Sequence, residues 1–141
     1  MTTCSDVMTR NPACAHPDDT VASVAQLMKE KDIGPVPIVQ DKISKELLGI
    51  VTDRDLAMKV VAPGRDPNRT TVREVMTTDV ITCREDDEIE KALDAMSQHQ
   101  LRRILVVDND NMLVGIIAQA DVATRMDEPE KTGEVVKEIS E

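Results

Sequence analysis

Apolar residues along this chain recur with helical spacing in two separate stretches. In the first stretch, apolar residues three and four positions apart predict a helix with one buried face, and Asp19 is the expected N-cap. That face carries Val21, Val24, Ala25, Leu27 and Met28. A second stretch repeats the spacing with Ile89, Ala92, Leu93 and Met96. The pattern therefore predicts two amphipathic helices of the same kind.

Short apolar runs predict strands after each of these helices. In the first half of the chain the runs cover residues 36–39 and 47–51, with a polar turn at 41–46 between them and a second helix over 53–61. In the second half they cover 104–107 and 113–117, with a turn at 108–111 and a helix from about residue 119. Each half therefore reads as the same series of elements.

The two halves also share sequence. Asp6-Val7-Met8-Thr9 recurs as Glu74-Val75-Met76-Thr77, an offset of 68 positions that also aligns Met28 with Met96. The later strand Gly49-Ile50-Val51 matches Gly115-Ile116-Ile117 at an offset of 66. A small unit of this kind needs a neighbour to bury its apolar face. We predict a first repeat at 6–62, a linker at 63–73, a second repeat at 74–126 and a charged tail at 127–141.

Composition narrows the possible functions. The 141 residues include no Phe, Tyr or Trp and carry a net charge of −10, which argues against nucleic-acid binding through a basic face or aromatic stacking. No apolar run approaches the roughly 20 residues of a membrane span, and residues 1–6 lack the features of a signal peptide. The odd cysteine count, without CxxC spacing, suggests neither a disulfide framework nor a zinc site. These features predict a cytoplasmic protein that binds neither membrane nor nucleic acid.

Several motifs carry a resemblance to a known family. They are the two Val-Met-Thr openings, Ile33-Gly34-Pro35-Val36-Pro37-Ile38-Val39 and Gly49-Ile50-Val51-Thr52-Asp53-Arg54-Asp55. The chain resembles a pair of CBS domains (a Bateman module) over about residues 6–126. With Asp32-Ile33-Gly34 and Asp66-Pro67-Asn68 it is most similar to the stand-alone hypoxic-response type of bacterial protein.

This resemblance implies an α+β fold of two tandem β-α-β-β-α repeats packed with pseudo-two-fold symmetry. It also implies a regulatory module that senses AMP, ADP, ATP or S-adenosyl compounds such as S-adenosylmethionine in clefts between the repeats. Members of the family commonly form homodimers, and a separate protein partner is a further expectation. No resident cofactor and no metal are expected.

The resemblance implies that the Thr52 hydroxyl contacts a phosphate of the ligand. It also implies that the Asp55 carboxylate binds the two ribose hydroxyls. The chemistry fits, because a carboxylate offers two acceptor oxygens to a cis-diol and a helix start favours an anion. Thr52 and Asp55 also form an ordinary helix-capping box, and both roles can coexist. In the second repeat, Asp121 keeps the carboxylate, but Ala118 stands where the hydroxyl is expected. The two clefts are therefore predicted to be unequal.

The remaining candidates surround these turns. The resemblance implies that Arg103 contacts phosphate through its guanidinium, and Arg54 is a second candidate for this contact. The alternative for Arg103 is a surface arginine that neutralises nearby acids. Thr82 and its counterpart Cys14 would lie against the adenine base. Val36 and Ile104 would line the apolar slots that hold the base.

Alternative sites and functions stay open beside this interpretation. His16 and His99 with Cys14 and Cys83 lack the spacing of a metal site, and a disulfide between Cys14 and Cys83 is left undecided. The second function is a stress-related structural or interaction protein that binds no nucleotide, favoured by Ala118, Cys14 and Gly34-Pro35. An enzyme is not expected, because no catalytic arrangement of side chains is visible in the sequence.

Overall fold

The computed structural model describes residues 2–125, so the predicted tail at 127–141 lies outside the described residues. The chain divides into two compact units, residues 13–80 and residues 2–12 with 81–125, which are called here the 13–80 unit and the 81–125 unit. The predicted repeat boundaries divide the chain by sequence and remain a prediction. In this contact-based division each opening segment belongs to the unit built mainly from the other repeat.

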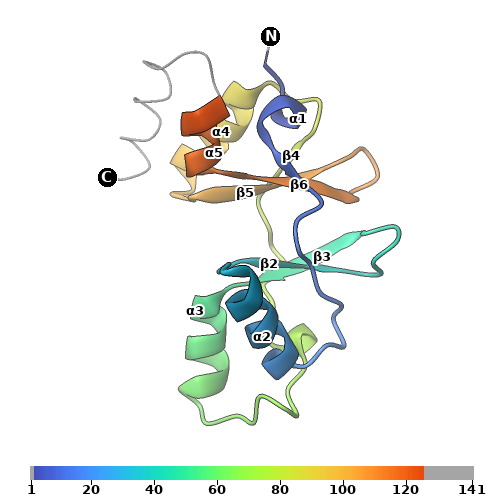
Figure 1. Cartoon of the computed structure of the whole chain (residues 1–141), viewed down its shortest axis with the longest axis vertical. Coiled ribbons are helices and arrows are strands. Elements are labelled where there is room, and N and C mark those ends of the chain that lie inside the picture. Colours follow the sequence, from blue (N-terminus) through green and yellow to red (C-terminus); the bar gives the residue numbers. More distant parts are fainter. Residues whose placement is uncertain (1, 126–141) are drawn as a thin grey trace. The chain divides into compact units, whose positions relative to one another are not determined.

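The 13–80 unit contains the first set of predicted elements. Helix α2 (Val21–Lys31) is followed by strands β2 (Val36–Val39) and β3 (Leu47–Val51). Helix α3 (Asp53–Leu56) continues as a π-helical segment, η1 (Ala57–Val61), and a short 3₁₀ turn, η2 (Val72–Glu74), comes later. Strands β2 and β3 pair antiparallel, and α2 and α3 cover one face of the pair (Figure 1). This confirms the predicted strands and the helix over 53–61.

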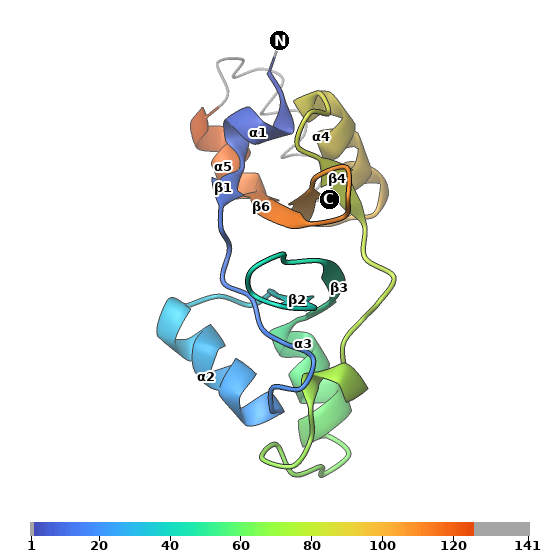
Figure 2. The ribbon, with the colours of Figure 1, turned by 90° about the vertical axis from the view of Figure 1, so that its right-hand side faces the viewer.

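The 81–125 unit contains the second set. Strand β4 (Thr82–Arg84), helix α4 (Ile89–Gln98), strands β5 (Arg103–Val107) and β6 (Leu113–Ala118) and helix α5 (Gln119–Arg125) follow in order. They are joined by helix α1 (Cys4–Val7) and strand β1 (Thr9–Arg10) from the start of the chain. The strands form a mixed sheet in the order β1-β6-β5-β4. Both views show α1, α4 and α5 on one face of this sheet (Figures 1 and 2).

Strand pairing shows that the two units are built alike. In the 81–125 unit, Cys83 pairs parallel with Val106. In the 13–80 unit, the residues 68 positions earlier, Ala15 and Ile38, form a single parallel bridge. On the opposite side, Thr77 bridges Ile50 of β3, as Thr9 pairs with Ile116 of β6. The sheet of the 13–80 unit is therefore a reduced copy, with two strands extended by single bridges.

Each unit has its own aliphatic core. The core of the 13–80 unit includes Val72 from the end of the linker and Val75 from the opening of the second repeat, while Val7 and Met8 from the opening of the first repeat lie in the other core. Glycines on the central strands make room for these segments. A Cβ at Gly49 would lie 2.7 Å from the Thr77 carbonyl oxygen, and one at Gly115 would lie 2.5 Å from Met8 Sδ. The Val-Met-Thr and Gly-Ile motifs are therefore packing partners.

Two details of the sequence analysis were wrong. Thr20, not Asp19, is the N-cap of α2, since its hydroxyl accepts a hydrogen bond from Ser23 N at 3.1 Å. The Asp19 carboxylate instead accepts from His16 N. Ala25 is exposed, because α2 buries only the narrower stripe of Val21, Val24 and Met28. All four residues predicted on the face of α4 are buried: Ile89, Ala92, Leu93 and Met96.

Candidate functional site

The turn between β3 and α3 holds the first pair of candidates. Thr52 N donates to Asp55 Oδ2 at 3.0 Å, and the Thr52 hydroxyl contacts the same oxygen at 3.2 Å. Asp55 N in turn donates to Thr52 Oγ1 at 3.2 Å. This is a complete capping box, so the structural role considered for the motif is present. Both side chains are partly buried.

The second oxygen of Asp55 has a partner as well. Lys59 Nζ lies 3.3 Å from Asp55 Oδ1 and donates to the Val75 carbonyl at 3.0 Å. Lys59 belongs to the π-helical segment η1, and its ammonium therefore links the carboxylate to the backbone of the next repeat's opening segment. Since the Asp55 side chain is 16% exposed, a ribose diol would have to share these oxygens with Thr52 and Lys59.

The segment just before β2 lies against the start of α3. Asp53 N donates to the Gly34 carbonyl at 3.1 Å, and a Cβ at Gly34 would approach the Asp53 carboxylate to 3.4 Å. Arg54 is exposed and takes part in no ion pair among residues 2–125. The only guanidinium on this turn is therefore available to an anion, beside two acidic residues.

The equivalent turn of the 81–125 unit gathers three candidates. Ala118 N donates to Asp121 Oδ2 at 3.1 Å, which keeps the backbone half of the box. Arg103 pairs with Ala118 across β5 and β6, and its side chain is exposed. Both strands are one residue longer here than predicted, because this pair closes the ladder. The structure thus brings Arg103 and Asp121 to the same end of the sheet.

Sequence reasoning missed one residue at this turn. The Thr9 hydroxyl, on β1, lies 3.5 Å from Asp121 Oδ2. The two residues are 112 positions apart, so no local motif joins them. The one available signal was the Thr9–Thr77 equivalence in the repeat, together with the close approach that Gly115 permits.

The candidates for the base have different environments. Thr82 lies on β4 opposite Leu105 and is partly buried, and Cys14 is partly buried beside the Ala15 bridge. Val36 and Ile104 are core residues of their own units, with 0% and 2% of their surfaces exposed. The role of these four residues against a base remains a prediction.

The cysteines are all free thiols. Cys83 and Cys4 both belong to the core of the 81–125 unit, where the Cys83 thiol donates to the Leu105 carbonyl oxygen at 3.8 Å. The neighbouring Cys4 thiol and burial raise the pKa of Cys83 above its usual range, and the neighbouring Cys83 thiol lowers the pKa of Cys4. Cys14 belongs to the other unit.

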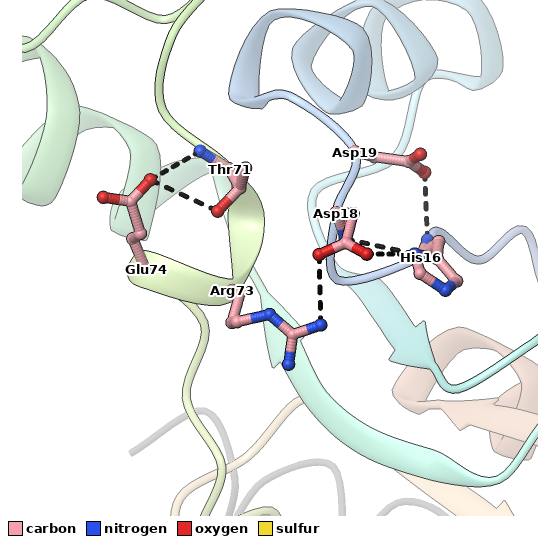
Figure 3. A network of polar contacts seen from close by, with 6 residues as sticks. All are labelled: His16, Asp18, Asp19, Thr71, Arg73 and Glu74. Carbon is pink, nitrogen blue, oxygen red and sulfur yellow. Dashed lines mark hydrogen bonds and ion pairs between the residues drawn. The ribbon is translucent and has the colours of Figure 1, made fainter.

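His16 lies in a polar network rather than in a metal site (Figure 3). Its Nδ1 accepts from Asp18 N at 3.1 Å, and the Asp18 carboxylate pairs with Arg73 at 3.1 Å. The network fastens η2, where the linker meets the second repeat, to the loop before α2. Among the described residues no group of three or more His, Cys, Asp or Glu side chains could hold a metal ion.

Comparison with known proteins identifies the family. The CBS domain model matches residues 4–62 and 72–128. The chain belongs to the CBS-domain family. It is 37% identical to hypoxic response protein 1 of Mycobacterium tuberculosis over 91% of this chain and 87% of that protein. The crystal structure of hypoxic response protein I with two coordinated zinc ions superposes with a TM-score of 0.79 and 36% identity, covering 89% of this chain and 100% of that one.

Two further CBS structures contain adenine-based ligands. The CBS domain pair of protein MJ0100, in complex with 5-methylthioadenosine and S-adenosyl-L-methionine, has a TM-score of 0.73 and 30% identity, with 88% of this chain and 94% of that chain covered. CBSX2 in complex with AMP has a TM-score of 0.74 and 26% identity, with 88% and 95% covered. These neighbours support a ligand-binding CBS pair in general. Among the described residues, the chain has no helix long and apolar enough to span a bilayer.

Proposed function

We propose that this protein is a non-catalytic regulatory module whose two CBS repeats bind an adenine nucleotide or an S-adenosyl compound. The observation that carries the proposal is the pair of equivalent carboxylates, Asp55 and Asp121. Each follows the last strand of its repeat, and each is held by the backbone N–H three residues earlier. The ligands in MJ0100 and CBSX2 support the adenine class.

The ribose and the phosphate of a nucleotide each have a chemical counterpart on these turns. The two oxygens of a carboxylate match a ribose cis-diol, and a guanidinium matches phosphate. Arg54 and Arg103 are both exposed, the first on the same turn as Asp55 and the second at the same end of the sheet as Asp121. They add positive charge at these turns in a chain whose net charge is −10. Because phosphate is an anion, we expect binding to weaken as salt screens these cations.

A second candidate function follows from Asp55 itself. Its two oxygens already contact Thr52 and Lys59, so the turn is stable without a ligand. The protein would then be a structural or interaction module, related to stress, whose clefts stay empty. Calorimetry separates this function from the first, because it predicts no heat of binding with any adenine compound.

Titration calorimetry with AMP, ADP, ATP and S-adenosylmethionine tests the proposal directly. Hydrogen bonds to a charged group contribute about 1.5–3 kcal/mol, so D55N and D121N should each weaken one site about tenfold or more. D53N is the matched control, because Asp53 is an exposed carboxylate on the same turn that lies outside the capping box. Equal affinity in D55N, D121N and the wild type would contradict the proposed sites.

We also propose a homodimer that acts in the cytoplasm, where free thiols persist. Met58 and Val61 are 58% and 74% exposed on the helical segment after α3. Two large apolar side chains one turn apart form an exposed patch of the kind that self-association covers.

A further inference from the structure

The two carboxylates of the proposed site have the same kinds of partner at the same atom. Asp55 Oδ2 contacts the backbone nitrogen of Thr52 at 3.0 Å and its hydroxyl at 3.2 Å. Asp121 Oδ2 contacts the backbone nitrogen of Ala118 at 3.1 Å and the hydroxyl of Thr9 at 3.5 Å. A threonine hydroxyl is therefore beside the carboxylate in both units, although it comes from different parts of the chain.

The backbone explains how Thr9 reaches this position. Strand β1 pairs antiparallel with β6, and Thr9 lies opposite Ile116, two residues before Ala118. Gly115 permits the pairing, because a Cβ there would lie 2.9 Å from the Thr9 carbonyl oxygen. Thr9 is exposed, so its hydroxyl lies at the surface on which a ligand would meet Asp121.

We propose that Thr9 is a positioning residue that supplies the hydroxyl missing at Ala118 and completes the nucleotide site at Asp121. This inference rests on the proposed function and adds residues 2–12 to the site. At 3.5 Å the contact is long for a hydroxyl–carboxylate hydrogen bond. We therefore expect it to shorten when a ribose diol draws the carboxylate into one orientation.

The test isolates the Asp121 site in a D55N background and measures nucleotide affinity by calorimetry. T9V, which is nearly isosteric and lacks the hydroxyl, should weaken binding about threefold to tenfold. T9S, which keeps the hydroxyl, should bind like the parent. Adding A118T to T9V should restore affinity by returning the hydroxyl to its usual place. T77V is the matched control, because Thr77 holds the equivalent position in a unit where Thr52 already supplies the hydroxyl.

Failure of this inference differs from failure of the proposed function. If the parent binds and T9V binds equally well, the proposed function stands and the role of Thr9 is refuted. If no adenine compound binds the wild type, the proposed function fails. A measurement without ligand then still tests whether Thr9 and Asp121 interact. In that measurement T9V and D121N should shift the thermal midpoint non-additively, and additive shifts would overturn the inference.

Discussion

Replacing Gly115 by alanine tests how tightly the opening segment of the chain is held on β6. The added Cβ would lie 2.5 Å from Met8 Sδ, 2.8 Å from Met8 Cγ and 2.9 Å from the Thr9 carbonyl oxygen. Two of these atoms belong to a flexible side chain and can shift. The carbonyl oxygen belongs to the β1 backbone, so relieving that contact moves the strand itself.

Overpacking of this kind costs about 1–3 kcal/mol, which lowers the thermal midpoint of a chain this size by about 3–12 °C. Thermal unfolding followed by circular dichroism measures the shift. M8A shortens the side chain that the new methyl meets, so M8A with G115A should cost less than the sum of the two single changes. Q98A, at an exposed end of α4, serves as the control and should stay within about 0.5 kcal/mol of the wild type.

The same substitution has a functional consequence. Because the shift of β1 would carry Thr9 away from Asp121, G115A should weaken the Asp121 site and leave the Asp55 site unchanged. G49A makes the corresponding contact with Thr77, at 2.7 Å, and should lower the midpoint without this effect on Asp121. A G115A protein that unfolds at the wild-type temperature would refute the packing argument.

The remaining predictions concern pH and assembly. Hydrogen bonds from Ser44 lower the pKa of Asp41, and those from Thr71 and Arg65 lower the pKa of Glu74, so both groups favour the folded state above their unfolded pKa values. This stability is lost as the pH falls below about 4 through the folded values, and D41N and E74Q should flatten the acid side of a midpoint–pH curve. Sedimentation at micromolar concentration should give twice the monomer mass, and M58E with V61E should give the monomer. I43E, at a lone apolar side chain that is 96% exposed, should leave the dimer intact, and a wild-type monomer would contradict the assembly.

Most of the secondary structure could be predicted because its signals are local. The four apolar residues of α4 are buried as their spacing predicts, and the runs at 36–39 and 47–51 are strands. The N-cap error is of one residue, since Asp19 and Thr20 are both capping residue types and only the backbone decides between them. Ala25 was placed on the buried face by mistake, because a small residue beside the buried stripe fits both a buried and an exposed position.

The exchange of opening segments could not be predicted from the repeat. An offset of 68 shows that Met8 and Met76 are equivalent, but it does not show which unit either one packs in. The structure places Met8 in the core of the 81–125 unit, and Met76 packs against the other core. The glycines at 49 and 115 carry the corresponding signal, since each faces a Met-Thr pair that only a missing side chain admits.

The predicted inequality of the two clefts shows where motif reasoning ends. That prediction considered only the four residues of each turn. Within them, the hydroxyl that Thr52 supplies is missing at Ala118. A carboxylate responds to any donor near its oxygen, whatever the separation along the chain. Thr9 lies 112 positions from Asp121 and contacts its Oδ2. In the other unit, the Thr52 hydroxyl contacts the equivalent oxygen of Asp55. The difference in affinity between the sites should therefore be smaller than the tenfold that loss of a hydrogen bond to a charged group implies. For the same reason, A118T should strengthen the Asp121 site more in a T9V background than in the wild type.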